Sequence, residues 1–526
     1  MRTVPRHSLS RRSLIRGGGG LAAVVAVGGA AACSPGAGGG ARKTVVAPGS
    51  AMVRSAEARR RVAGRSTVTA RLTPRPVTVD IGARTVQTWA YGEQLPGPPL
   101  RAKAGDLLKV TVENRLPTDT SVHWHGLALR NDMDGVPHLT QDPIGVGDSF
   151  DYEFTAPDPG TYFYHPHTGV QLDRGLYGVF VVDDPAEPGN YDKEWVVVLD
   201  DWVDGTGRTP DDVFAALTED NGAGSGSSGS MGGMDQGSGS GDSRAMNGMS
   251  GMGESMNSPL LGGAGDVVYP HYLVNGRTPE APHRFTGRPG QRVRVRLVNA
   301  GSDTAFRVAV GGHRMTVTHS DGFPVVPVSA DALLIGMGER FDVVLTLRDG
   351  VFALVASAEG KSGQARALIR TASGRPPAVG GTVPELGRHV LLGTDLAGAP
   401  EVRLPAAAID RHHDVALGGT MNPYRWTING RAFPDPAPLP VSGGQRVRLR
   451  LINHTMMFHP MHLHGHTFGL VDGGARKDTV IVRPMRALEV DLDTDNPGQW
   501  ALHCHNILHA EAGMMTALSY RTESAA

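Results

Sequence analysis

A cysteine with a histidine on each side lies near the C-terminus, and it is the residue best suited to redox chemistry. From His503 the chain reads H-C-H-N-I-L-H-A-E-A-G-M, which places His509 and Met514 shortly after Cys504. A thiolate, two imidazoles and a weak thioether are the ligands of a blue-copper electron-transfer site. The sequence therefore predicts a copper site on these three residues, with His459 from an upstream cluster as the second imidazole.

Histidines recur in four clusters along the chain. They are H-W-H-G at 123–126, H-P-H at 165–167, H-P-M-H-L-H-G-H at 459–466 and the C-terminal string. On an extended strand, residues i and i+2 point to the same side, so each H-X-H can present two imidazoles to one cavity. Eight histidines arranged in this way could hold three ions, with a short covalent path to them from the sulfur of Cys504. A histidine-rich metal tail, or histidines that only pack in a core, are the alternatives; four clusters favour a metal centre.

An internal repeat predicts the elements that position these clusters. In each of three copies an alternating apolar and polar run leads from a glycine to an asparagine nine residues later: Gly105 to Asn114, Gly290 to Asn299, and Gly444 to Asn453. Alternation with a period of two predicts a strand with one buried face. The 71 glycines and 37 prolines favour many short strands joined by turns. Three diverged copies of a β-sandwich unit therefore account for most of the chain.

The four ligand motifs, in this order, are similar to those of the multicopper oxidases, the three-domain type that includes laccases and bacterial copper-efflux oxidases. The resemblance covers about residues 65 to 522. It implies an all-β fold of three consecutive cupredoxin-like Greek-key β-sandwich domains, at 65–190, 191–378 and 379–526. It also implies an oxidase that holds four copper ions and passes electrons one at a time from a donor to O₂, which is reduced to water.

The resemblance also implies a ligand set for each copper, carried over position by position. The type 1 copper would bind His459, Cys504 and His509, with Met514 as the axial ligand. The type 2 copper would bind His123 and His462. One type 3 copper would bind His125, His165 and His505, and the other His167, His464 and His503. Since His503 and His505 are peptide-bonded to Cys504, they would carry electrons between the sites, while His466 would be structural.

An acidic residue follows the first histidine cluster. Asp134, in the stretch M-D-G-V-P, matches an acidic residue that members of the family place beside the copper cluster, where protons must arrive. The alternative is an ordinary turn aspartate before Gly135. Both interpretations remain open from the sequence.

The N-terminus predicts an export signal over residues 1–33. S-R-R-S-L-I-R at 10–16 resembles a twin-arginine motif, and the apolar run after it is too short to span a bilayer in the mature protein. A-A-C at 31–33 resembles a lipoprotein cleavage site, so we expect a lipid on Cys33 that anchors the protein on the outer face of the cytoplasmic membrane. A plain cleavable signal followed by secretion is the alternative. With either signal, residues 34–64 would form a flexible linker.

A segment of glycine, serine and methionine at 221–258 lies within the predicted second domain and has too few aliphatic residues to form a core. Thioethers are soft ligands that select Cu(I), so this segment predicts copper capture rather than a plain flexible linker. Its methionines are Met231, Met234, Met246, Met249, Met252 and Met256.

Two further methionines, Met456 and Met457, lie directly before the cluster that begins at His459. In the copper-efflux oxidases that this chain resembles, a methionine two residues before this histidine binds substrate Cu(I), and Met457 matches it; Thr455 stands where those enzymes use an acidic residue. These features predict an oxidase of Cu(I) with a role in copper resistance, active also on phenols, aromatic amines or Fe(II). A laccase of phenolic substrates and a non-catalytic copper-sequestering protein are the alternatives. A net charge of −1 gives no reason to expect nucleic acid as a partner.

Overall fold

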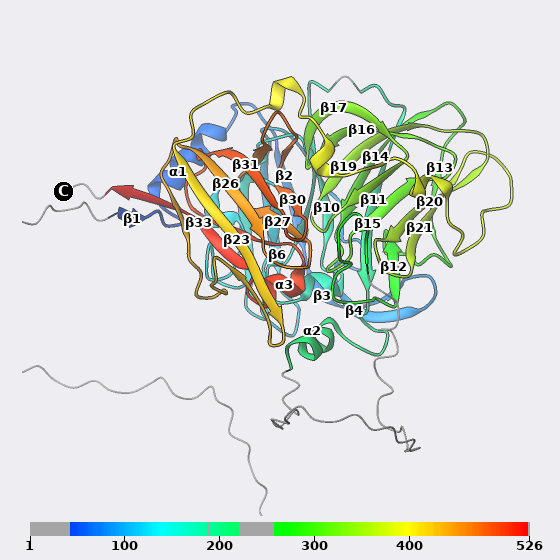
Figure 1. Ribbon diagram of the computed structural model, residues 1–526, viewed down its shortest axis with the longest axis horizontal. Helices are drawn as coiled ribbons and strands as arrows, with labels where there is room; N and C mark the ends of the chain where they lie inside the picture. The colour runs from blue at the N-terminus through cyan, green and yellow to red at the C-terminus, as the bar shows by residue number, and fades with distance from the viewer. Residues whose placement is uncertain (1–42, 188, 220–256, 524–526) are drawn as a thin grey trace, which may run out of the picture. The chain divides into compact units, whose positions relative to one another are not determined.

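The computed structural model describes residues 43–187, 189–219 and 257–523, which are folded mainly into β-strands (Figure 1). The strands form three consecutive pairs of sheets, as the all-β prediction requires. In Figure 1 the strands of the second pair, in green, and those of the third pair, in yellow to red, form two separate groups. The predicted export signal, Cys33 and the six methionines of the glycine-rich segment lie outside the described residues.

The first sandwich packs a four-stranded sheet, in the order β5-β10-β9-β7, on a three-stranded sheet, β2-β6-β8; β3 and β4 form a hairpin of their own. Its strands are β2 (Thr67–Leu72), β3 (Pro74–Asp80), β4 (Thr85–Tyr91), β5 (Leu100–Lys103), β6 (Leu107–Glu113), β7 (His123–His125), β8 (Ser149–Thr155), β9 (Gly160–His165) and β10 (Gly178–Asp183). Two 3₁₀ turns, η1 (Asn131–Met133) and η2 (Gln171–Arg174), lie in its loops.

The second sandwich consists of two six-stranded sheets, β12-β11-β14-β19-β16-β17 and β13-β21-β20-β15-β18-β22. Its strands are β11 (Lys193–Trp202), β12 (His271–Val274), β13 (His283–Thr286), β14 (Arg292–Asn299), β15 (Phe306–Val310), β16 (Met315–Ser320), β17 (Phe323–Ala330), β18 (Ala332–Ile335), β19 (Arg340–Thr346), β20 (Val351–Ala358), β21 (Gln364–Arg370) and β22 (Val390–Leu391). The 3₁₀ turns η3 (Pro384–Gly387), η4 (Gly393–Asp395) and η5 (Pro400–Val402) lead to the third sandwich.

The third sandwich packs the sheet β24-β23-β26-β31-β28-β29 on the sheet β1-β33-β32-β27-β30, with β25 paired to β33. Its strands are β1 (Lys43–Val45), β23 (Arg411–Met421), β24 (Tyr424–Ile428), β25 (Leu439–Val441), β26 (Arg446–Asn453), β27 (His459–Leu463), β28 (Phe468–Leu470), β29 (Arg476–Lys477), β30 (Thr479–Val482), β31 (Ala487–Asp493), β32 (Gln499–Cys504) and β33 (Met515–Glu523).

The repeat has the same structural role in each sandwich. Its three glycines have φ angles of 88°, 82° and 79°, in the left-handed region that favours glycine, and each begins the turn into an alternating strand. The asparagine that ends each strand is buried. Its amide group donates to backbone carbonyl groups of neighbouring segments, for example from Asn453 to the oxygens of Met457 and Val482. The equal spacing therefore reflects equal turns and equal strand lengths.

The alternation predicted one exposed face for each repeat strand, and this is wrong for β14. Arg294 and Arg296 on its polar face are buried, because they pair with Asp342 of β19 at N–O distances of 2.5 and 3.1 Å. Arg296 also donates to Thr161 of β9 in the first sandwich. A sandwich that packs on another sandwich buries both faces of its sheet, and the arginines are tolerated because they are paired.

The predicted flexible linker at 34–64 is partly structured. Strand β1 pairs with β33, so residues near the start of the described chain complete the third sandwich. Helix α1 (Ala51–Arg60) follows, with Ser50 as its N-cap; it buries Val53 and also Glu57, whose carboxylate accepts from the backbone and side chain of Thr155. The second sandwich also continues past the predicted boundary at 378, because β22 pairs with β18.

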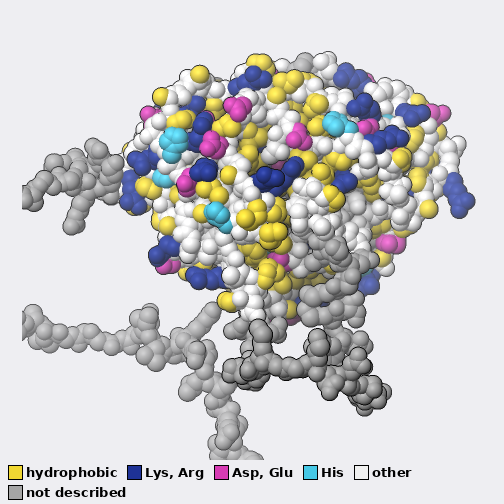
Figure 2. All heavy atoms as spheres, in the orientation of Figure 1, with side chains coloured by type: hydrophobic (Ala, Val, Ile, Leu, Met, Phe, Trp, Pro, Cys, Tyr) yellow, Lys and Arg dark blue, Asp and Glu magenta, His cyan; other side chains and the backbone are white. Residues whose placement is uncertain are grey.

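Two further helices are short. Helix α2 (Pro210–Thr218) has a capping box formed by Thr209 and Asp212, and α3 (Ile507–Glu511) is capped by Asn506. Among the residues described, no helix is long and apolar enough to cross a membrane. On the face shown in Figure 2, basic and acidic side chains are interspersed, in keeping with the low net charge.

Candidate metal centre

The cysteine and two of the predicted histidines meet inside the third sandwich. The sulfur of Cys504, at the end of β32, lies 3.6 Å from Nδ1 of His459 at the start of β27 and 3.6 Å from Nδ1 of His509 in α3. The two ring nitrogens are 3.1 Å apart, and all three residues are fully buried. Met514 is buried as well, and its carbonyl oxygen accepts from the backbone N–H of Cys504. These residues can enclose one ion.

The other eight predicted histidines meet between the first and third sandwiches. Strand β7 and the loop after β9 come from the first sandwich, and β27 and β32 from the third. His123 stacks on His464 with ring centroids 3.7 Å apart, and His125 stacks on His462 at 3.8 Å. Three sets of ligand atoms each lie within 4.8 Å of one another: His123, His125 and His165; His123, His462 and His464; and His167, His464 and His503.

The ring nitrogens fit bound metal ions. In four of these histidines, Nδ1 donates to a backbone carbonyl oxygen: His123 to Asp134, His165 to Pro166, His462 to Asp478 and His503 to Cys504. This leaves Nε2 as the atom with a free lone pair. Within the described part of the chain, Nε2 of His123, His165 and His462, Nδ1 of His125 and both ring nitrogens of His505 are buried without a hydrogen-bond partner. Buried polar atoms need partners, and metal ions would supply them.

Burial also sets the protonation of these rings. It lowers the pKa of His125, His165, His167, His464 and His505 well below the ordinary value for histidine, and the neighbouring imidazoles lower it further. For His503 the same causes lower the pKa to about 3. The rings are therefore neutral at pH 7. Metal binding requires neutral imidazole, so the folded chain holds the rings in the form that binds metal.

Asp134 lies within this group of histidines. Its side chain is fully buried, and its Oδ2 is 2.9 Å from Nδ1 of His464 while its Oδ1 is 3.3 Å from Nδ1 of His123. A turn aspartate on the surface would make neither contact. The carboxylate therefore touches two of the predicted ligands directly.

Two acidic residues that belong to no sequence motif, Asp478 and Asp266, also contact predicted ligands. Asp478 lies 3.4 Å from ring nitrogens of both His125 and His462, and Arg340 of the second sandwich binds its carboxylate with both guanidinium arms. Burial opposes ionisation of Asp478, but Arg340 outweighs it and holds the pKa below its usual range. Asp478 lies in no histidine motif, so the sequence offered no local signal for its contact with the histidines.

The second of these acidic residues, Asp266, contacts the cysteine group. Its Oδ2 lies 2.8 Å from Nε2 of His509 and accepts from the hydroxyl of Tyr424 at 2.6 Å. Burial disfavours a charged imidazole, yet the Asp266 carboxylate and Cys504 raise the pKa of His509 to about 10. Asp266 thereby orients the His509 ring and leaves Nδ1 directed at the sulfur.

The methionines predicted to bind substrate lie beside the same group. The side chain of Met456 is 71% exposed, whereas Met457 is partly buried against the core. Thr455 lies 2.8 Å from Nε2 of His459 through its hydroxyl group. The segment after 257 passes over this region, since a Cβ atom on Gly263 would lie 3.8 Å from the sulfur of Met457.

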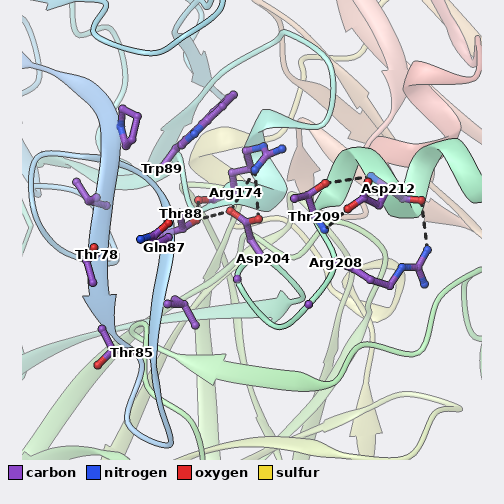
Figure 3. Close-up of a pocket in the computed structure, with 15 residues that line it drawn as sticks. Thr78, Thr85, Gln87, Thr88, Trp89, Arg174, Asp204, Arg208, Thr209 and Asp212 are labelled. Atoms are coloured by element: carbon purple, nitrogen blue, oxygen red, sulfur yellow. Dashed lines mark hydrogen bonds and ion pairs between the residues drawn. The ribbon is translucent and has the colours of Figure 1, made fainter.

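His466 is directed away from the other histidines of its cluster. Its Nε2 lies 2.7 Å from the hydroxyl of Tyr520, and its Nδ1 lies near the carbonyl oxygen of His464. A surface groove with a volume of 910 Å³ is lined by residues of β3, β4, η2 and the segment from Asp204 to Asp212 (Figure 3). It includes none of the predicted copper ligands.

Comparison with known proteins agrees with this geometry. Family models described as multicopper oxidase match residues 73–187, 194–374 and 410–524. The chain is 49% identical to multicopper oxidase MmcO of Mycobacterium tuberculosis over 476 residues, which cover 90% of each chain. It is 31% identical to a copper resistance protein A homolog of Pseudomonas syringae pv. tomato, over 83% of this chain and 89% of the relative. The structure of Fet3p, a multicopper oxidase that functions in iron import, superposes with a TM-score of 0.72 at 21% identity, covering 86% of this chain and 90% of that one.

Proposed function

The chain belongs to the multicopper oxidase family, and we propose that it oxidises Cu(I) with O₂ as the electron acceptor and thereby contributes to copper resistance. The family binds copper in a four-ion arrangement, and its members are oxidoreductases of three cupredoxin-like domains. Membership of the family does not specify the electron donor, and the proposal that the donor is Cu(I) goes beyond it. Four Cu(I) ions would each give up one electron, and O₂ would take up four electrons and four protons to form two water molecules.

The proposal assigns the ligands as follows. The type 1 copper is held by His459, Cys504 and His509 with Met514, and the type 2 copper by His123 and His462. The type 3 coppers are held by His125, His165 and His505, and by His167, His464 and His503. Two of these sets support the assignment, since the ligand atoms of His459, Cys504 and His509 and those of His167, His464 and His503 each lie within 4.8 Å of one another; the other two sets rest on the resemblance to the family. Bound copper supplies one-electron redox chemistry at the cysteine and O₂ reduction at the histidines.

The chain itself provides the route between the two sites. Cys504 is peptide-bonded to His503 and His505, and the carbonyl oxygen of Cys504 accepts from Nδ1 of His503 at 2.9 Å. This hydrogen bond gives a shorter path from cysteine to imidazole than the backbone alone. Asp134, in contact with His123 and His464, is placed to hold or pass a proton there.

The observation that carries the choice of donor is the exposed thioether of Met456, three residues before His459. Thioethers are soft ligands that select Cu(I). Met457 follows it in the chain, and the hydroxyl of Thr455, which precedes it, contacts the ring of His459 directly. The relatives named copper resistance protein A support the proposed role in copper resistance. The predicted methionine-rich segment, at 221–258, precedes Gly263 and Asp266 by a few residues in the sequence, so we expect its thioethers to deliver Cu(I) to this side of the site.

A double substitution of Met456 and Met457 by leucine tests this choice. Leucine keeps the apolar volume but removes the soft ligand, so kcat/KM for Cu(I) should fall roughly tenfold or more, while kcat/KM for a bulky phenol stays nearly unchanged. The matched control is Met52→Leu, at a methionine that is 43% exposed in α1. Equal losses with both donors would instead favour a laccase. A copper-loaded protein that consumes no O₂ with any donor would indicate sequestration.

We also propose that the protein is exported and anchored by a lipid on Cys33. The twin-arginine motif and the A-A-C sequence support this, as does the single thiol left in the folded domains, which a bound metal would protect. The Cys33→Ser variant should leave the membrane fraction and appear in the soluble envelope fraction with its activity intact. Retention of the variant in the membrane fraction would contradict the anchor.

A further inference from the structure

A group of carboxyl side chains without a matching cation lies buried between the first and second sandwiches. Asp173 of η2 and the adjacent Asp200 and Asp201 of β11 are each at most 1% exposed. Tyr269 donates to Asp173 at 3.0 Å, and Tyr177 donates to Asp200 at 2.6 Å. The carboxylate of Asp201 accepts from the backbone N–H groups of Ser302 and Asp303. The copper ligands do not explain why so many acids are buried together.

Three oxygen atoms in this group are unsatisfied. Across the described residues, Oδ1 of Asp173, Oδ1 of Asp200 and the hydroxyl of Ser302 are buried without a hydrogen-bond partner. Buried oxygens of this kind hold a proton or bind internal water. The hydroxyl of Ser302 lies close enough to Asp173 to affect its ionisation.

Burial and like charge favour the protonated form of these acids. Burial raises the pKa of Asp173 and of Asp200 well above the ordinary value for aspartate, and the neighbouring Asp201 raises both further. The nearby cations are engaged elsewhere: Lys361 pairs with Asp303 at 2.5 Å, and Arg174 pairs with Asp204 at 3.2 Å. Like charges that share a buried site cannot all ionise, so part of the group stays protonated at neutral pH.

The group lies between a surface groove and the segment that follows the last histidine motif. At one end, Arg174 and Asp204 form part of the wall of the 910 Å³ groove, where Figure 3 shows them paired beside Thr88. Asp173 precedes Arg174 in η2 and interacts electrostatically with Asp204. At the other end, the carbonyl oxygen of Ser302 accepts from the backbone N–H of Ile507, two residues after His505.

We propose that Asp173, Asp200, Asp201 and Ser302 form a proton relay that leads from this groove to the histidine site where O₂ is reduced. A carboxylic acid of the relay releases a proton to internal water, which carries it to the reduced oxygen, and the carboxylate regains a proton from solvent through the groove. Four such transfers balance the four electrons that convert one O₂ into two water molecules. The relay rests on O₂ as the acceptor and is independent of the donor.

Infrared spectroscopy tests the stored protons without turnover. The carboxylic acid C=O band of the copper-loaded protein at pH 7 should lose intensity in the Asp173→Asn and Asp200→Asn variants. Asp349→Asn, at an exposed residue of the second sandwich, is the matched control and should leave the band unchanged. If the double variant D173N/D200N has the same band as the wild type, the buried acids are ionised and the relay is wrong.

Reoxidation kinetics test the transfer itself. The copper-loaded enzyme is reduced chemically without Cu(I) substrate and then mixed with O₂, so a failure of the proposed donor does not affect the result. D173N/D200N should reoxidise roughly tenfold more slowly, within the usual range for loss of a proton-transfer group. The slowing should grow as the pH rises and in ²H₂O. Ser302→Ala, which removes only a hydroxyl, should show a smaller effect of the same kind, and Asp173→Glu should restore the rate.

Copper content and the blue absorption band serve as checks on structure and should match those of the wild type in every variant. Reoxidation of D173N/D200N at the wild-type rate and with the wild-type pH profile would overturn the relay. A slower rate without any change in pH profile or solvent isotope effect would also overturn it, since it would indicate a positioning role only.

Discussion

At the scale of single residues, the backbone decides which nitrogen of each imidazole is available. In His123, His165, His462 and His503 a carbonyl oxygen accepts the Nδ1 proton, which fixes the tautomer and the plane of the ring. Two of these carbonyls belong to residues next to the ring's own residue in sequence, Pro166 and Cys504. The H-P-H and H-C-H motifs therefore supply both a ligand and the group that orients it.

Asp134 orients a ring with a side chain instead, which makes its contribution testable. Asp134→Asn keeps the size of the side chain but removes the negative charge beside His464 and His123. Loss of such a partner typically lowers metal affinity or activity 10–100-fold. We expect a comparable loss of copper affinity at the histidine site, measured as the type 2 electron paramagnetic resonance signal during copper titration.

The control for this measurement is Asp132→Asn, two residues away. Asp132 pairs with Arg130 in a partly exposed position and does not line the histidine site. Its variant should titrate as the wild type does. If D134N also titrates as the wild type, Asp134 is only a turn residue after all.

At the scale of elements, the sequence predicted what depends on local spacing. The equal distance from glycine to asparagine indicated three equivalent strands, and the i, i+2 histidines were expected to share a side of a strand; β6, β14 and β26 carry the repeat, and β7 carries His123 and His125. Both signals arise within ten residues of chain. They could therefore be recognised without knowledge of which sheet packs on which.

Contacts between sandwiches were not predictable in this way. Asp478 meets His125, and Asp266 meets His509, although each pair is separated by more than two hundred residues. Neither aspartate belongs to a motif, so only the packing of whole sandwiches brings them to the site. The buried arginines of β14 were missed for the same reason, because the face that looked exposed lies against β9 of the first sandwich.

At the scale of the whole molecule, one arginine joins all three sandwiches. Arg340 begins β19 of the second sandwich, donates to the carbonyl oxygen of Thr161 in the first, and binds Asp478 in the third at 2.6 and 2.7 Å. The groups that accept hydrogen bonds from the Arg340 side chain are buried. The carboxylate of Asp478 in turn contacts His125 and His462. The histidine site needs the first and third sandwiches held together, and Arg340 links both through the second.

Arg340→Met therefore should weaken both the assembly of the sandwiches and the metal site between them. Methionine fills much of the volume but leaves the buried carboxylate of Asp478 without its cation, whereas the nearby Asp321 keeps Lys477. Removal of one member of a buried ion pair costs about 3–5 kcal/mol. Because a protein of three domains unfolds irreversibly, the measurement is the half-life of oxidase activity and of bound copper at elevated temperature.

The matched control is Arg448→Met, whose partner Asp491 is partly exposed and lies within the same sandwich, so its loss costs about 0–1 kcal/mol. We expect R340M to lose copper from the histidine site before the blue band of the cysteine site fades, since Arg340 contacts only the former. Equal half-lives for R340M and R448M would show that the three sandwiches hold the histidines without this bridge.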